Sequence, residues 1–303
     1  MGTFNNIIRF LFKIFLSAET RDKTEKVILT IAIVSFFLHL AFIFLVQLKV
    51  LELPFESDLL ENPISAAYTP FSFILIYEVY LLIYYLPKSF TTYITKQYEI
   101  ITLIIIRKLF KDLSALELSS EWFEIKGDLQ FTYDLLGSLL LFYLIFLFQK
   151  QGRRKVMDQE KIEKSVKSFI SKKKIIATAL IPLLFGMALY TFIDWTLSFS
   201  FNSSDLNPFE SINDLFFDEF FSVLIIVDVV LLLVSLFYTD QFHKIIRNSG
   251  FIISTILIRM SFGVSGAIST ILIVVAVLFG LSIIFIHNKY EKDLSNIDND
   301  TMP

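Results

Sequence analysis

The sequence contains no cysteine, and this absence excludes disulfide bonds, thiolate metal sites and cysteine nucleophiles. Histidine is scarce as well. The chain has only His39, His243 and His287, which lie so far apart in the sequence that we expect no cluster of metal ligands from them. Three common enzyme signatures are also missing, namely Gly-x-Ser-x-Gly, His-Glu-x-x-His and Gly-Lys-[Ser/Thr]. We therefore expect no catalytic site, no cofactor and no metal.

Apolar residues, in contrast, are abundant: 55% of the 303 residues are hydrophobic and the mean hydropathy is +0.65. A soluble core of this size could not bury so much apolar surface, so the bilayer must be the main solvent. We predict an all-α, polytopic membrane protein with about eight transmembrane helices. The third and seventh spans are short, and each could instead be re-entrant. The eight apolar runs are 27–48, 69–87, 98–111, 133–148, 175–196, 220–238, 251–262 and 267–286.

The positions of the charged residues predict how these helices cross the membrane. If the N-terminus is cytoplasmic, the inner segments hold most of the 27 Lys and Arg residues. The outer loops then hold only Lys49, Lys111 and Lys126 and are rich in Asp and Glu. This asymmetry follows the positive-inside rule at every crossing, whereas six spans would break the alternation. We therefore expect a multi-pass protein of a bacterial inner (cytoplasmic) membrane with both termini in the cytoplasm.

Two cytoplasmic segments are expected to meet the membrane surface. Residues 1–26 begin with the apolar stretch Phe4–Leu16, in which Arg9 and Lys13 share one face, as in a helix lying along the inner leaflet. The alternative is a disordered or merely packed tail. The linker 150–173 is rich in Lys and Arg, and we expect a helix that attracts anionic lipids. We do not expect nucleic acid as a partner, because positive-inside sorting already explains this charge.

The two halves of the chain resemble one another, which predicts a tandem duplication. The tetrapeptide Pro-Phe-Glu-Ser occurs at 54–57 and at 208–211, after the first span of each half. In each half it is followed by a span with one acid and then by a span with an Arg after an apolar run. We expect one four-helix unit at 27–149 and a second at 174–288, before an acidic tail at 289–303. An even number of spans per copy makes the two copies parallel.

Each half places one acid and one Arg inside its predicted spans: Glu78 and Arg107 in the first, Asp228 and Arg259 in the second. With a rise of 1.5 Å per residue, the acid and the Arg of each half reach similar depths near the middle of the bilayer. A lone charge there costs at least about 3 kcal/mol. We therefore expect Glu78–Arg107 and Asp228–Arg259 ion pairs, or the crosswise exchange between halves. Such pairs either belong to an ion or proton pathway or a two-state lock, or act as structural pins that fix helix register.

Three further residues extend a candidate polar pathway. His39 lies midway along the first span and is either a proton relay or a hydrogen-bonded core histidine. Asp134 and Asp194 lie near the outer ends of their spans, where they can reach water. These residues favour a channel, a transporter or a membrane sensor. The alternative is a non-conducting scaffold or effector subunit, which acts through partner proteins or as a homo-oligomer.

One stretch of the first half points to a family. An acid in one span, Glu78, is followed by Gln97-Tyr98-Glu99-Ile100-Ile101 and then by Ile104-Ile105-Ile106-Arg107-Lys108. This pattern resembles the phosphate-starvation-inducible PsiE-type membrane proteins, which are small four-helix proteins. In the second half, Ser249-Gly250 stands in place of the Tyr-Glu pair and Met260 in place of the Lys. The resemblance implies a duplicated four-helix unit and brings no established activity with it.

Overall fold

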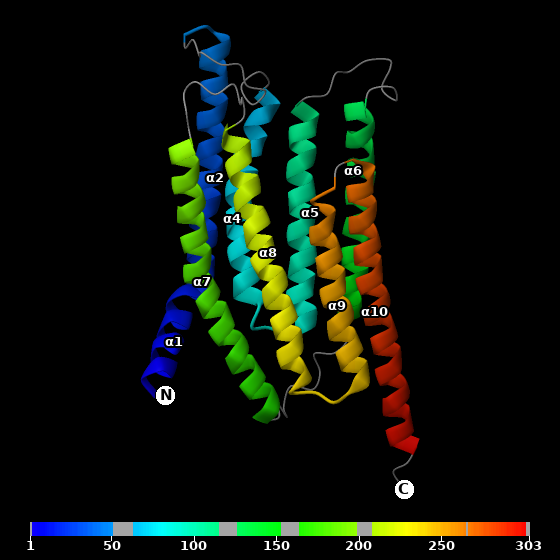
Figure 1. The fold of residues 1–303 in the computed structure, drawn as a ribbon. Coiled ribbons are helices and arrows are strands. Elements are labelled where there is room, and N and C mark those ends of the chain that lie inside the picture. Colours follow the sequence, from blue (N-terminus) through cyan, green and yellow to red (C-terminus); the bar gives the residue numbers. More distant parts are fainter. Residues whose placement is uncertain are drawn as a thin grey trace. The chain divides into compact units, whose positions relative to one another are not determined.

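The computed structural model describes residues 2–50, 63–114, 126–152, 164–198, 208–264 and 266–300, and all regular structure within these ranges is helical. Figure 1 shows the helices in chain order. They are α1 (Gly2–Phe15), α2 (Ala18–Gln47), the short 3-10 helix η1 (Pro63–Ala67), α4 (Tyr68–Tyr85), α5 (Phe90–Ser114), α6 (Lys126–Gly152), α7 (Lys164–Ser198), α8 (Pro208–Leu236), α9 (Phe242–Ser261) and α10 (Ala267–Asp300).

Local signals in the sequence set several helix boundaries. Ser17 separates α1 from α2, and its hydroxyl oxygen accepts a hydrogen bond from the backbone N–H of Thr20. Ser89 does the same for Thr92 at the start of α5. Both serines satisfy an N–H group that has no partner within its helix. Between α9 and α10, Gly266 adopts a φ of 78°, a left-handed conformation that favours glycine.

Six helices in the described ranges are long and apolar enough to cross a membrane. They coincide with six of the eight predicted spans. The third and seventh predicted spans fall on α5 and α9, which are helices of 25 and 20 residues but less apolar than the others. The eight-span arrangement and the duplication therefore stay predictions. The six segments are 18–47, 63–85, 129–152, 168–190, 219–236 and 267–294.

Several of these helices expose large apolar side chains. Phe37 and Leu38 on α2 are 61% and 66% exposed, and Leu136 and Leu139 on α6 are exposed to a similar extent. In water such apolar stripes would be unfavourable, whereas lipid tails solvate them at no cost. The exposed faces and the helix lengths together indicate a membrane-embedded protein.

The chain divides into two compact units. Unit 1 comprises residues 1–84, 103–132 and 174–223, and unit 2 comprises residues 85–102, 133–173 and 224–303. Helices α5, α6, α7 and α8 therefore contribute residues to both units.

Unit 1 is held together by contacts that join the N-terminal helices to α4. The Tyr80 hydroxyl donates a 2.8 Å hydrogen bond to the carbonyl of Phe15, where α1 ends. The Tyr77 hydroxyl donates to the Glu25 carboxylate of α2 at 3.0 Å. α1 is thus a helix over most of the predicted amphipathic stretch, and its C-terminal end contacts α4.

Unit 2 has a core of aromatic rings that meet edge-on or at a tilt. Tyr98 of α5, Phe148 of α6 and Phe251 of α9 are fully buried, with the Phe148 ring centroid 5.0 Å from that of Tyr98 and 5.4 Å from that of Phe251. Helices α9 and α10 lie side by side (Figure 1). A Cβ atom at Gly250 of α9 would come within 2.7 Å of the Ile283 side chain of α10, so the missing side chain lets these helices approach closely.

Some segments that the sequence singles out lie outside the described residues. These are the tetrapeptide at 54–57 and residues 153–163 of the basic linker. The acidic tail is described as far as residue 300, where α10 ends.

Candidate functional site

Unit 2 buries two opposite charges side by side, Asp228 on α8 and Arg259 on α9. The Arg259 Nη2 atom lies 2.9 Å from the Asp228 Oδ2 atom, and the side chains are 4% and 0% exposed. This is one of the two ion pairs expected from the sequence. Because neither charge reaches water, each depends on the other and on its hydrogen bonds.

Two polar side chains of α5 complete the coordination of this pair. The Tyr93 hydroxyl donates a 2.9 Å hydrogen bond to Asp228 Oδ1, and the Gln97 amide N–H donates to Asp228 Oδ2 at 3.3 Å. The Gln97 amide oxygen accepts a 2.8 Å hydrogen bond from Arg259. Tyr93 and Gln97 lie four residues apart and therefore share one face of α5. Three helices thus meet at a single buried polar network.

One buried hydrogen-bond donor of this network has no partner among the described residues. The Nη1 atom of Arg259 is buried and makes no hydrogen bond within the described ranges. Leaving such a donor without a partner costs about 1–3 kcal/mol, so this atom can gain energy by binding an acceptor that reaches it.

Three consecutive residues of α5, Gln97 to Glu99, lie in this region of unit 2. Gln97 belongs to the buried network, and the Tyr98 hydroxyl is hydrogen-bonded to the Ser254 hydroxyl at 2.7 Å. Glu99, the next residue, points to a polar cavity in the same unit. Each of the three consecutive side chains therefore has a defined polar environment.

The cavity has a volume of about 600 Å³, which is in the range of small-molecule sites. Hydroxyl, amide and charged side chains form almost all of its wall. It is lined by Ser89, Thr91, Thr92, Thr95, Lys96, Glu99, Gln149, Gln151, Gly152, Arg247, Ile284, His287 and Asn288.

The cavity wall contains an ion pair between Lys96 and Glu99. One carboxylate oxygen of Glu99 forms an ion pair with the Lys96 ammonium group. The other accepts a 2.7 Å hydrogen bond from the Gln149 amide. The Asn288 amide donates to the carbonyl of Gln151 at 3.1 Å. The wall therefore presents both signs of charge together with neutral donors and acceptors, a combination suited to a small polar solute or a hydrated ion.

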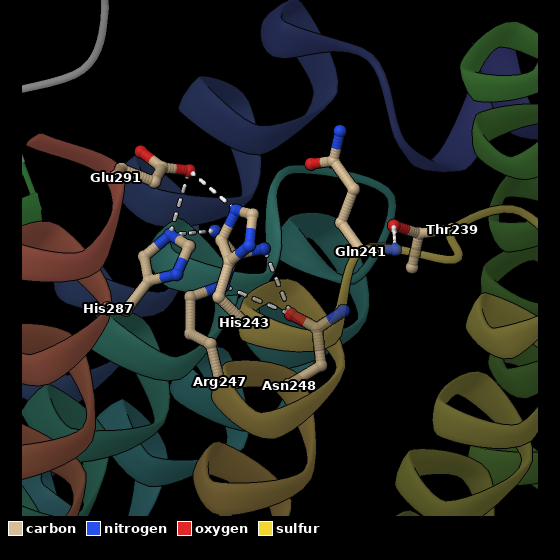
Figure 2. Close-up of polar contacts among 7 residues, drawn as sticks. All are labelled: Thr239, Gln241, His243, Arg247, Asn248, His287 and Glu291. Carbon is tan, nitrogen blue, oxygen red and sulfur yellow. Dashed lines mark hydrogen bonds and ion pairs between the residues drawn. The ribbon is translucent and has the colours of Figure 1, made fainter. Parts of the chain in front are cut away.

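At one side of the cavity, the structure corrects the expectation that the histidines form no cluster. The rings of His243 on α9 and His287 on α10 stack with centroids 5.3 Å apart (Figure 2). Glu291 approaches both rings: its Oε1 atom is 3.2 Å from His287 Nε2 and 3.6 Å from His243 Nε2. The third histidine, His39, belongs to unit 1.

Arg247 adds a positive charge to the histidine cluster. Its Nη1 atom lies 3.0 Å from His287 Nε2, and its Nε and Nη2 atoms donate to Asn248 Oδ1 at 3.2 and 3.0 Å (Figure 2).

The other predicted site residues lie in different places. Glu78 and Arg107 are half-buried residues of unit 1, on α4 and α5, and their pairing stays a prediction. His39 Nδ1 is hydrogen-bonded to the Thr69 hydroxyl at 2.5 Å. Asp134 is buried in unit 2 and accepts a hydrogen bond from the Thr270 hydroxyl, instead of facing water at the end of its helix. Asp194 lies in α7.

Sequence reasoning missed Tyr93, Gln97 and Lys173. The i, i+4 spacing of Tyr93 and Gln97, which puts both side chains on one face of α5, was a readable signal. Lys173 looked like one of many cations in the linker, yet it is buried, and its ammonium group donates to the carbonyl of Lys88 at 2.9 Å. It also lies 4.3 Å from the centre of the Phe90 ring.

No family model, curated protein or solved structure matches this chain. Its class therefore rests on its own features. Six apolar helices with exposed apolar faces define a helical membrane protein.

Proposed function

We propose that this is a multi-pass inner-membrane protein that conducts or transports an ion or a small polar solute, or senses one. The proposal includes eight crossings, with both termini in the cytoplasm. At 1.5 Å per residue, α5 and α9 are about 37 and 30 Å long, enough to cross a bilayer. Both helices bury polar groups against neighbouring helices, which compensates for their lower hydropathy. A duplicated PsiE-type four-helix unit, with anionic lipid at the basic linker, belongs to the same proposal.

One observation carries the proposal. Unit 2 combines a buried Asp228–Arg259 pair, in which one guanidinium donor has no partner among the described residues, with a polar cavity of about 600 Å³. Ionisable residues inside a membrane typically mark ion or substrate pathways. A spare buried donor is what a transient ligand needs, because binding removes the cost of leaving that donor unsatisfied.

A flux assay tests this function directly. The full chain is reconstituted into liposomes of phosphatidylethanolamine and phosphatidylglycerol, and proton and potassium fluxes are followed with internal dyes. We expect flux above that of protein-free vesicles, and a change of at least several-fold in Asp228→Asn. Glu19→Gln is the matched control, because Glu19 pairs with Lys23 at the exposed start of α2. Flux equal to that of protein-free vesicles in every variant would count against conduction.

The second candidate is a non-conducting scaffold subunit, and a specific observation favours it as well. Both oxygens of Asp228 are satisfied by groups of the same chain, as a structural pin requires. In that case Asp228→Asn lowers the stability of the protein, and neither the wild type nor the variant conducts ions. Cross-linking in native membranes would then trap a partner protein or a second copy of the chain.

A further inference from the structure

His243, His287 and Glu291 bring three metal-binding atoms to one point. All three atoms lie within 4.8 Å of one another, and Glu291 Oε1 is 3.2 and 3.6 Å from the two imidazole Nε2 atoms (Figure 2). A tetrahedral Zn²⁺ ion with bonds of about 2.0–2.1 Å holds its ligands about 3.3 Å apart. Two of the three separations already match this spacing.

The backbone holds these ligands in place. His287 and Glu291 are four residues apart on α10, so they share one face of that helix. His243 is in the first turn of α9, and its ring stacks with those of His287 and Tyr290. Since α9 and α10 pack closely at Gly250, the ligands sit on two rigid elements, the arrangement that a binding site requires.

We propose that His243, His287 and Glu291 bind a divalent first-row transition-metal ion, with Zn²⁺ as the best fit. Imidazole and carboxylate ligands suit this class of ion, and three protein ligands leave a fourth position for water. His287 also lines the polar cavity, which gives the ion and its water a route to the site. The proposal is independent of whether the protein conducts.

Arg247 is hydrogen-bonded to His287 Nε2, the atom through which His287 would bind the metal. One N–H of its guanidinium points to the Nε2 atom of His287, and that nitrogen has a single lone pair. The metal ion and Arg247 therefore compete for the same atom. Two other guanidinium nitrogens stay bonded to Asn248, so only the contact with His287 has to break when the metal binds. This competition predicts an effect that a purely structural cluster would not show.

Cobalt binding to the wild-type protein is the first test. The full chain is purified in detergent, stripped with EDTA and titrated with Co²⁺, whose visible absorption bands report tetrahedral coordination by nitrogen and oxygen. We expect one equivalent to bind, Zn²⁺ to displace it and Mg²⁺ to leave the bands unchanged. A spectrum equal to that of the detergent blank would overturn the proposal.

Variants then locate the ion. His287→Gln and Glu291→Gln keep side chains of similar shape and should weaken Co²⁺ binding by at least about 100-fold, the upper range for losing a mere outer-shell partner. His39→Gln is the matched control: it removes the third histidine of the chain, which lies in unit 1, and should bind as the wild type does. Equal loss in all three variants would indicate non-specific binding and refute the assignment.

Arg247→Gln has the opposite expected effect. Removing the competing cation should tighten Co²⁺ binding by about tenfold or more, although a hydrogen bond is lost. Circular dichroism and gel filtration confirm that each variant is folded. Unchanged or weaker binding in Arg247→Gln would contradict the placement of the ion on His287 Nε2, whatever the histidine variants do.

Discussion

The carboxylate of Asp228 and the guanidinium of Arg259 lie 2.9 Å apart, although 31 residues separate them in the sequence. Removing one member leaves the other as a buried charge without its counterion, which costs about 3–5 kcal/mol. We expect Asp228→Ala to lower the thermal unfolding midpoint in detergent strongly. The double variant Asp228→Leu/Arg259→Met should lose less, because no charge is left behind.

An exposed pair provides the comparison. Glu19 and Lys23 are 2.6 Å apart on α2, and both side chains are more than 70% exposed. Water already solvates these charges, so Glu19→Ala should leave the unfolding midpoint unchanged. A midpoint shift in Glu19→Ala as large as that in Asp228→Ala would show that burial does not set the effect.

Gly280 on α10 leaves room for the hydroxyl group of Tyr98. A Cβ atom at Gly280 would overlap that hydroxyl and come within 3.1 Å of the Ser254 hydroxyl to which it is bonded. We expect Gly280→Ala to destabilise the protein by about 1–3 kcal/mol, because a fully packed core cannot absorb the methyl group. Gly186→Ala is the matched control, since no heavy atom lies within 4 Å of a Cβ there. Thermal unfolding of both variants checks the prediction, and equal losses would contradict it.

The hydrogen bond from Thr270 to the buried Asp134 should also contribute to stability. Thr270→Val removes the donor and leaves a carboxylate oxygen less well satisfied, at a cost of about 1–3 kcal/mol. Thr30→Val is the control, because the Thr30 hydroxyl is exposed and bonds to the carbonyl of Lys26 in its own helix. Chemical unfolding in detergent should separate the two variants. A Thr270→Val protein as stable as the wild type would mean that this contact adds nothing.

The absence of cysteine makes the topology straightforward to test, because every introduced cysteine is the only thiol in the chain. Lys244 and Val264 lie at opposite ends of α9, and Ser89 and Leu113 lie at opposite ends of α5. With eight crossings, a membrane-impermeant maleimide labels Val264→Cys and Leu113→Cys in intact cells. Lys244→Cys and Ser89→Cys react only after the membrane is permeabilised. Equal labelling of both members of a pair would show that the helix between them does not cross.

Part of this architecture could be predicted from the sequence. The apolar runs located the membrane-length helices, because burial in lipid requires an uninterrupted apolar length whatever the fold. Depth alone predicted that Asp228 would pair with Arg259 or, crosswise, with Arg107, since a charge in the bilayer needs a counterion at its own level. The structure shows the pair with Arg259.

Side-chain clusters that depend on helix rotation could not be predicted in the same way. His243 and His287 meet only because α9 and α10 pack in one particular register, and sequence distance contains no information about that register. Only the four-residue spacing of His287 and Glu291, which places both on one face of a helix, could be recognised in the sequence. Lys173 was missed for a related reason: its burial depends on the carbonyl of Lys88, 85 residues earlier in the chain.

The polar contacts of α5 have a consequence for biogenesis. Tyr93 and Gln97 bond to Asp228, which the ribosome adds 135 and 131 residues later. When α5 leaves the ribosome, the partners of these two side chains have not yet been synthesised. We therefore expect the insertion machinery to shelter helix α5 until α8 and α9 emerge, and nascent chains that stop short of Asp228 to leave α5 open to membrane quality-control proteases.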